Sequence, residues 1–226
     1  MPTDTFLRSG LLASLHGRMQ VTPRHVRAGE VVYRAGTPFN TLFAVTAGAL
    51  KTTRHCLDGR DRLASLHLAP DWLGFDGIVD NSYAWQATAL TDADLVCINY
   101  QELLNAARTA PALLQQLHAE MGHEMARHRE LAISWRRLAV NERVGRFLLD
   151  WIIRSRAGED PGDEVTVSLP LSRAEIGDLL GMTVESVSRA LSHLVHEGVI
   201  SFADTARRSI HVPDPKALRS VFLAHA

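Results

Sequence analysis

The chain has 226 residues, of which 46% are hydrophobic and 22% charged, a composition typical of a globular protein with one or two cores. No apolar run approaches the ~18 residues of a membrane helix, and the first residues lack the pattern of a secretory signal, so we expect a cytoplasmic protein with no membrane partner. The formal net charge of -1 is not the basic balance common in nucleic-acid-binding domains, so DNA binding must depend on where individual charges lie.

Short apolar segments separated by glycine-containing turns fill the chain from about residue 26 to residue 99. Segments of this length, alternating or continuously apolar, are typical of β-strands. The expected strands are residues 31–33, 42–45, 50–55, 62–68, 86–90 and 95–99. Their regular spacing predicts a compact β-sandwich or barrel.

A long helix is expected to begin near Pro111, with a stripe of residues at alternating steps of three and four, as in a heptad repeat. The stripe consists of Leu114, Leu117, Met121, Glu124, His128, Leu131, Trp135 and Leu138. A lone helix of ~40 Å cannot cover such a stripe, so we predict the seam of a homodimer. Two interpretations stay open for Glu124 and His128: a solvated or paired position on the seam, or a role in setting the register or titrating near neutral pH. The alternative is that the stripe packs on the chain's own β domain.

Two short helices joined by a tight turn are predicted after a further helix over residues 141–156 and a strand over residues 165–169. Ser172 and Glu175 form a capping box that begins the first short helix, and Gly181 can end it in the left-handed conformation. Thr183 can cap the second helix only two residues later. Helices joined so closely must cross steeply, which predicts a helix-turn-helix.

The second short helix has an inward apolar stripe and an outward polar one. The inward stripe is Val184, Val187, Leu191, Leu194 and Val195. On the outer side, Arg189 can donate two hydrogen bonds to guanine, Glu185 can accept one from cytosine, and Ser188 can bond to either kind of base edge. We predict that these three residues contact bases; the alternative is an ordinary exposed Glu/Arg pair.

Residues 198–212 are expected to form two strands around a turn, the wing of a winged helix. Arg207 and Arg208 near the tip are candidates for contacts with DNA phosphates, which position a protein without specifying sequence. Ser172, Thr183 and Ser192 are further candidates for the DNA backbone. The alternative for the two arginines is a fully solvated turn.

Three segments carry a resemblance to a known family. Residues 183–189, Thr-Val-Glu-Ser-Val-Ser-Arg, match a Glu-x-x-Ser-Arg recognition motif, residues 171–181 match the helix that precedes it, and residues 73–78, Leu-Gly-Phe-Asp-Gly-Ile, are similar to a β-roll segment. All three resemble the Fnr branch of the Crp/Fnr family of bacterial transcription regulators. The resemblance implies an α+β chain with a cyclic-nucleotide-binding-type β-roll, or double-stranded jelly roll (1–108), a dimerisation helix (109–138) and a winged helix-turn-helix DNA-binding domain (139–226).

The same resemblance implies how such a protein works. It implies a homodimer on double-stranded DNA, bound to a palindrome of TTGAT-like half-sites, with Glu185, Ser188 and Arg189 as the base-contacting residues. It also implies contact with RNA polymerase and control through the β-roll by a signal that the sequence does not identify.

Departures from the family concern that signal. An iron-sulfur cluster takes four thiolates, and Cys56 and Cys97 are the only cysteines, so we predict no cluster and two packed thiols. The cyclic-AMP branch holds the phosphate with an Arg-Ser pair where this chain has Ser82 and Tyr83, so cyclic AMP is not expected to bind. The predicted effector pocket is lined by Gly74, Phe75, Asp76, Ser82 and Tyr83.

The 11 histidines raise two alternatives, a metal and a haem. His123 and His128 miss the His-Glu-x-x-His zinc spacing by one residue, which turns their rings ~140° apart, so no metal site is predicted. A haem ligand stays open, without support from any spacing, among His16, His25, His55 and His67. An enzyme of the cupin type would need His-x-His on a strand, which the β region lacks, so we predict that the protein is not an enzyme.

Overall fold

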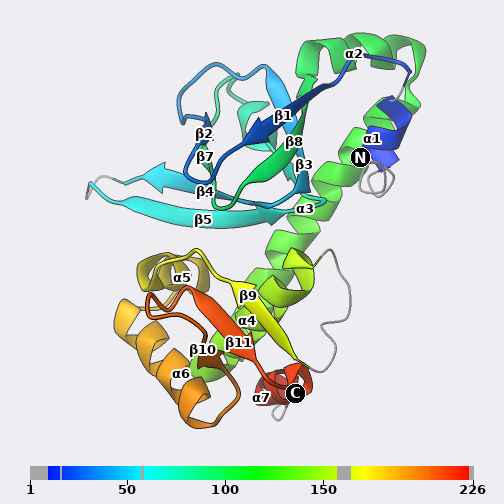
Figure 1. The fold of residues 1–226 in the computed structure, drawn as a ribbon. Coiled ribbons are helices and arrows are strands. Elements are labelled where there is room, and N and C mark those ends of the chain that lie inside the picture. Colours follow the sequence, from blue (N-terminus) through cyan, green and yellow to red (C-terminus); the bar gives the residue numbers. More distant parts are fainter. Residues whose placement is uncertain (1–9, 16, 57–58, 157–163, 224–226) are drawn as a thin grey trace. The chain divides into compact units, whose positions relative to one another are not determined.

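The structure is a computed structural model that describes residues 10–15, 17–56, 59–156 and 164–223, without the side chains of residues 131–132, 134–137 and 222–223. The chain forms two compact units, residues 1–130 and 131–226, which are joined within the long helix α3 (Ala112–Arg137) (Figure 1). Each unit has its own sheets and its own helices.

Two four-stranded antiparallel sheets form the body of the N-terminal unit, with strand orders β1-β8-β3-β6 and β2-β7-β4-β5. The strands are β1 (Thr22–Val26), β2 (Val31–Tyr33), β3 (Thr41–Ala47), β4 (Ala49–His55), β5 (Asp61–Leu68), β6 (Trp72–Leu73), β7 (Gln86–Ala89) and β8 (Ala93–Asn99). One apolar core, including Val45, Leu50 and Leu95, is drawn from both sheets. The predicted sandwich and all six predicted strands are confirmed.

Strands β1 and β6 were not predicted from the sequence. Of the five residues of β1 only Val26 is buried, and the strand contains Pro23, so it carries no apolar alternation. Strand β6 has two residues, fewer than any pattern can reveal. Both are edge strands, and each is fixed by one neighbour, β8 for β1 and β3 for β6.

Helices cover a second apolar cluster on the β1-β8-β3-β6 sheet. They are α1 (Gly10–Leu15), α2 (Tyr100–Thr109) and the first half of α3, and a 3-10 turn, η2 (Phe75–Gly77), follows β6. The side chain of Asn99 accepts a hydrogen bond from the Glu102 amide at 3.0 Å and begins α2. Leu42, Ile98 and Leu103 of this cluster are fully buried.

The position of α3 corrects the predicted dimer seam. Leu117 is 3% exposed in the cluster of its own unit, and Leu114 and Met121 pack against that cluster, so this part of the stripe faces the chain's own β domain. The side chains of Leu131 and Trp135 lie outside the described residues, and Leu138 is half-buried. The prediction was wrong at Leu117 because heptad spacing is the same whether a helix packs on a partner or on a sheet of its own chain.

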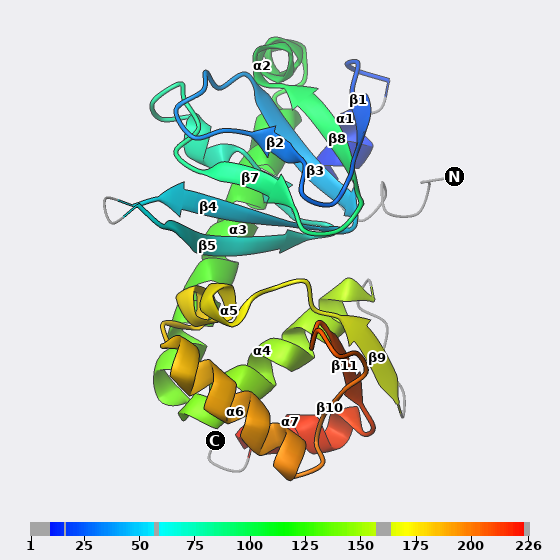
Figure 2. The ribbon, with the colours of Figure 1, turned by 60° about the vertical axis from the view of Figure 1, so that its left-hand side comes forward.

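The C-terminal unit surrounds a three-stranded antiparallel sheet of order β10-β11-β9 (Figure 2). Its elements are α4 (Val140–Ser155), β9 (Val165–Ser168), α5 (Arg173–Leu180), α6 (Val184–His196), β10 (Ser201–Phe202), β11 (Ser209–Val212) and α7 (Pro215–Leu223). Helix α4 packs against α6 and α7 and buries Val144, Phe147 and Leu148. The predicted helix-turn-helix and wing are confirmed.

No helix among the described residues is both long enough and apolar enough to cross a membrane.

Candidate functional site

Side-chain caps fix the helix-turn-helix at each predicted position. The Ser172 hydroxyl accepts a hydrogen bond from the Glu175 amide at 3.2 Å, and the Glu175 carboxylate accepts one from the Ser172 amide at 2.8 Å. Gly181 ends α5 with φ 64°, in the left-handed region, and the Thr183 hydroxyl accepts from the Ser186 amide at 3.2 Å. These caps hold α6 in a defined orientation on α5.

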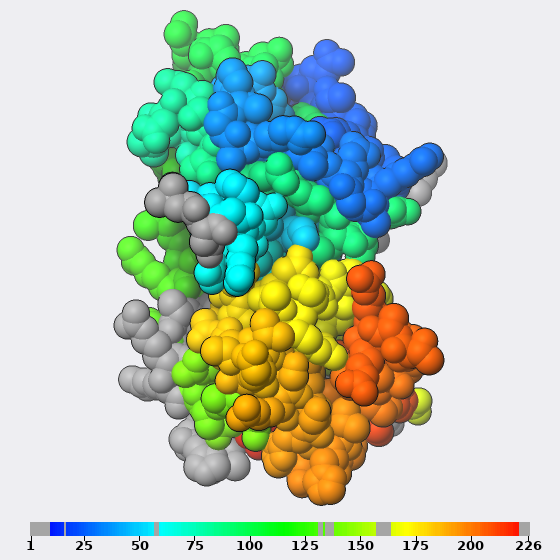
Figure 3. All heavy atoms as spheres, turned by 90° about the vertical axis from the view of Figure 1, so that its left-hand side faces the viewer, coloured from blue at the N-terminus to red at the C-terminus, as the bar shows by residue number. Residues whose placement is uncertain are grey.

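The three predicted base-contacting residues belong to α6, whose atoms form part of the orange surface in Figure 3. Glu185 and Arg189 are exposed and Ser188 is half-buried, one helical turn apart or less. Hydrogen bonds from the Glu185 amide and from Thr183 hold the pKa of Glu185 below its usual value, so it is an acceptor at neutral pH. An exposed acceptor and an exposed guanidinium therefore lie on one side of α6, with the half-buried Ser188 next to Arg189. Thr183 and Ser192 on the same helix are also exposed.

The inward stripe of α6 is shorter than predicted. Val187, Leu191 and Leu194 are at most 1% exposed, whereas Val184 is 45% and Val195 37% exposed. The periodicity is right, but both ends of the helix extend beyond the surface on which it packs. Val184 thus adds an apolar group beside Glu185, suited to contact a thymine methyl group.

The turn between β10 and β11 holds Arg207 and Arg208, both exposed. The Arg208 amide donates to Asp204 Oδ1 at 3.1 Å, and Arg207 has φ 55°, a left-handed conformation uncommon for a residue with a side chain. A further cation was not predicted: Arg173, at the start of α5, lies over the ring of Phe202, and so does Arg207. Only the fold brings these three residues together.

A cavity of about 460 Å³ lies in the N-terminal unit, between the β2-β7-β4-β5 sheet, the segment after β6, and α3. Gly74, Phe75 and Asp76 line it, as predicted. Other lining residues are Tyr33, Thr52, Ser65, His67, Trp72, Trp85, Glu124 and His128. Ser82 and Tyr83 do not belong to the lining, which corrects that part of the prediction.

Tyr83 instead belongs to the core. It is 4% exposed, its ring stacks on Tyr33 with centroids 4.0 Å apart, and its hydroxyl donates to the Thr41 carbonyl oxygen at 2.8 Å. An aromatic residue next to a turn is ambiguous in sequence, because it suits a pocket wall and a core equally well.

Asp76 occupies the backbone amides that follow Tyr83. Its carboxylate accepts hydrogen bonds from the amides of Ala84, at 2.8 Å, and Trp85, at 3.1 Å. Burial raises the pKa of Asp76, and these hydrogen bonds oppose that shift. A carboxylate in this place saturates the amides and repels an anionic ligand.

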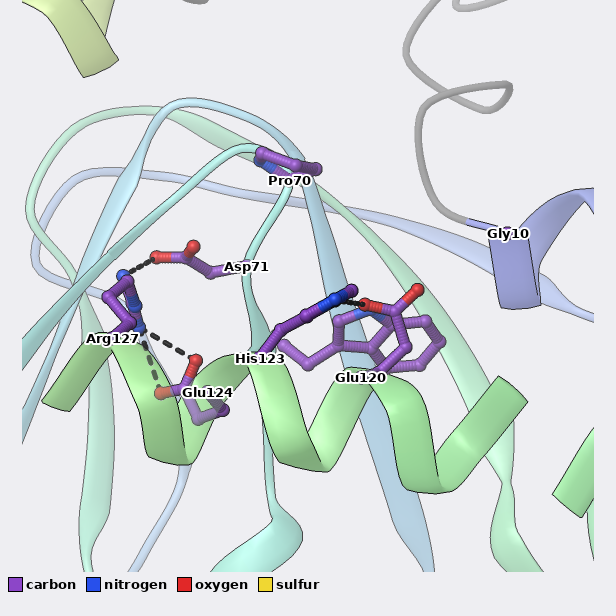
Figure 4. A pocket seen from close by; sticks show the side chains of 8 residues that line it. Gly10, Pro70, Asp71, Glu120, His123, Glu124 and Arg127 are labelled. Atoms are coloured by element: carbon purple, nitrogen blue, oxygen red, sulfur yellow. Dashed lines mark hydrogen bonds and ion pairs between the residues drawn. The ribbon is translucent and has the colours of Figure 1, made fainter. Parts of the chain in front are cut away.

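A network of charged side chains connects α3 to the loop between β5 and β6 (Figure 4). Arg127 contacts Asp71 and donates two hydrogen bonds to Glu124, at 2.7 and 2.8 Å. His128 Nε2 lies 2.9 Å from Glu124 Oε1, and a smaller cavity of about 230 Å³ adjoins the network. Glu124, predicted for the dimer seam, therefore faces its own β domain. His128, from the same predicted seam, bonds to Glu124 through Nε2.

His67 is the buried group closest to this network. Its Nδ1 lies 3.8 Å from Glu124 Oε1, and its Nε2 lies 3.2 Å from Ser65 Oγ. Burial lowers the pKa of His67 to about 4, so the imidazole is neutral at pH 7 and the contact is not an ion pair. Burial alone would raise the pKa of Glu124, but the hydrogen bond from His128 and the nearby positive charges lower it to about 2.

Acid should therefore destabilise the N-terminal unit. The unfolded chain binds more protons than the folded one at His67 between pH 6.5 and 4 and at Glu124 between pH 4.5 and 2, so stability falls as the pH falls through both ranges. We expect His67→Gln to flatten the dependence between pH 6.5 and 4, by up to about 3 kcal/mol. Urea unfolding at half-unit pH steps measures this; an unchanged slope in the variant would contradict it.

The described residues offer no group of three or more His, Cys, Asp or Glu side chains placed to hold a metal ion. Of the candidate haem ligands, His25 bonds to Asp94 and His55 to Asp61, His67 is buried, and His16 lies outside the described residues. Cys56 and Cys97 are free thiols, and both are half-buried.

A β-sandwich with an internal cavity, followed by a winged helix-turn-helix, defines a two-domain DNA-binding regulator. Residues 23–110 match the cyclic nucleotide-binding domain, and residues 142–221 match the Crp-like helix-turn-helix domain. The chain is 30% identical to the transcriptional activator protein anr of Pseudomonas aeruginosa, over 84% of this chain and 76% of that protein. It is 31% identical to electron transport regulator A of Shewanella oneidensis, over 77% of this chain and 69% of that protein.

The fold is also similar to that of a solved structure. FixK2 from Bradyrhizobium japonicum is 28% identical, with a TM-score of 0.74 over 92% of this chain and 100% of that one. The chain belongs to the Crp/Fnr family of transcription regulators and is not an enzyme.

Proposed function

We propose that the protein is a homodimeric, sequence-specific transcription regulator that binds a palindrome of TTGAT-like half-sites and is controlled through its β-roll. The outer face of α6 carries this proposal: Glu185, Ser188 and Arg189 project together from a helix that is capped at its start and buried along its inner side. A recognition helix contacts base edges with residues in its N-terminal part, which is where these three lie. Contact with RNA polymerase stays a prediction of the family resemblance.

Footprinting on a duplex containing TTGAT-N4-ATCAA tests the proposal. We expect protection of both half-sites by the wild-type chain, because two recognition helices on one face of DNA need half-sites about one turn, ~34 Å, apart. Inserting five base pairs between the half-sites rotates one of them to the far side of the duplex and should abolish simultaneous protection. Equal protection of a scrambled duplex would contradict the proposal.

The exposed side of α3 supports the homodimer. Ala119, Gly122 and Ala126 are exposed. At 100° per residue, Ala126 points about 180° away from Leu117, which is buried in the β domain. We therefore assign the dimer contact to this small-residue face, in place of the stripe expected from the sequence. Small side chains allow two helices to approach closely.

Ala126→Glu is expected to convert the dimer to a monomer. Two carboxylates would face each other across the helix pair without a partner, and their burial is strongly unfavourable. Sedimentation velocity of the full chain measures the change, with Gln101→Glu, exposed on α2, as the matched control. A variant that stays dimeric would place the interface elsewhere.

The β-roll cavity is the proposed effector site, and its chemistry argues against a cyclic nucleotide. Asp76 already occupies the amides of Ala84 and Trp85, and no arginine lines the cavity among the described residues. We also propose that no iron-sulfur cluster is bound, since two cysteines cannot supply four thiolates. Calorimetric titration with cyclic AMP should therefore give no heat of binding; micromolar affinity would contradict this assignment.

A further inference from the structure

Phe202 of β10 lies against two arginines from different parts of the C-terminal unit. The Arg173 guanidinium carbon is 5.3 Å from the centre of the Phe202 ring, and that of Arg207 is 5.4 Å from it. Arg173 belongs to the first helix of the helix-turn-helix and Arg207 to the turn of the wing. The Phe202 ring therefore connects α5 to the wing turn.

Neither arginine is neutralised. Among the described residues no carboxylate forms an ion pair with Arg173 or Arg207, whereas Arg127 pairs with Asp71 and Glu124 and Arg146 pairs with Asp150. Burial, and then the charge of Arg207, lower the pKa of Arg173, although a guanidinium stays protonated at neutral pH. Two like charges held together without a counter-charge are unfavourable until an anion binds between or beside them.

We propose that Phe202 is a positioning residue that holds Arg173 and Arg207 as a joint binding site for the phosphate backbone of DNA, connecting the wing to the helix-turn-helix. This inference rests on the proposed function only in that DNA is bound. It does not require base recognition by α6.

The physical basis is the preference of a guanidinium for an aromatic face. A cation over a ring gains ~0.5–1 kcal/mol at an exposed site, enough to restrict a flexible side chain to one region. The edge N–H groups of such a guanidinium remain free to donate to phosphate oxygens, commonly in pairs. The Arg207 guanidinium lies over the same ring from the wing, and its backbone there is left-handed. DNA then meets two oriented cations in place of two mobile ones.

The test is the salt dependence of binding to a duplex that contains no TTGAT half-site, measured by fluorescence anisotropy of the full chain. Each phosphate contact contributes ~0.9 to the slope of log affinity against log salt concentration. We expect Arg173→Gln and Arg207→Gln each to lower the slope by ~0.9 per subunit, or ~1.8 for the homodimer, so that raising salt from 50 to 200 mM weakens their binding about twelvefold less than it weakens the wild type's. Arg219→Gln, on the exposed side of α7, removes the same charge and should leave the slope unchanged.

Phe202→Leu is the decisive variant, because it removes no charge. We expect the salt slope of Phe202→Leu to fall by at least half of the change produced by Arg173→Gln. Phe202→Trp, which keeps an aromatic face, should have the wild-type slope. A thermal melt accompanies both variants, so that a loss of folding is recognised as a lower Tm. The proposal is overturned if folded Phe202→Leu keeps the wild-type slope, or if Phe202→Trp lowers it as much as leucine does. Because this duplex contains no TTGAT half-site, the salt slopes can be compared even if α6 does not recognise bases.

Discussion

Replacing Arg189 by alanine is expected to weaken binding to a TTGAT duplex by about 2 kcal/mol per half-site, roughly 30-fold. Arg189 is exposed on α6, one turn from Glu185, and its planar guanidinium can donate to both O6 and N7 of the guanine. Alanine keeps the helix intact but removes both donors. Anisotropy titrations with the TTGAT duplex and a scrambled duplex measure the difference.

The comparison between the two duplexes decides the role of Arg189. Affinity for the scrambled duplex should fall far less than affinity for the TTGAT duplex. Arg219→Ala, which removes an exposed arginine of the same unit, controls for net charge and should affect both duplexes slightly and equally. If Arg189→Ala weakened both duplexes equally, Arg189 would be a phosphate contact.

Gly177→Ala should disrupt the helix-turn-helix itself. A Cβ atom at position 177 would lie 2.6 Å from the Met182 carbonyl oxygen, a backbone atom that cannot rotate away. Helix α5 must then move from the turn, and overpacking of this kind destabilises a protein by ~1–3 kcal/mol. We expect faster hydrogen exchange in α5 and α6 and loss of binding to every duplex.

Gly10→Ala provides the matched control, since the same added atom would find nothing within 4 Å. It should leave hydrogen exchange and DNA binding unchanged. Wild-type exchange rates in α5 and α6 of Gly177→Ala would mean that the close contact of α5 with the turn is not required.

Local chemistry explains why the helix-turn-helix could be predicted from the sequence. The capping box of Ser172 and Glu175, the left-handed Gly181 and the cap at Thr183 each depend on a few adjacent residues, and all three were confirmed. The buried face of α4 also follows from its own periodicity. Where interactions are local, the pattern and the structure coincide.

Long-range packing explains what could not be predicted. The periodicity of α3 shows which of its residues are apolar. It does not show that Leu117 packs against the chain's own β domain, because an apolar stripe has the same spacing whichever surface it packs against. Helix ends present the same difficulty: Val184 fits the inward pattern, yet no part of the unit extends far enough to cover it. The pairing of Arg173 with Phe202 across 29 positions is created by the fold.

Replacing guanine N7 by a C–H group tests base recognition by α6 most directly. A TTGAT duplex in which 7-deazaguanine replaces the guanine lacks the N7 acceptor that Arg189 is proposed to use, while the shape and charge of the duplex are kept. We expect this change to weaken binding of the wild-type chain several-fold and to have no effect on binding by Arg189→Ala, so that the two losses are not additive. Equal weakening of both proteins, or none in the wild type, would contradict base recognition by α6.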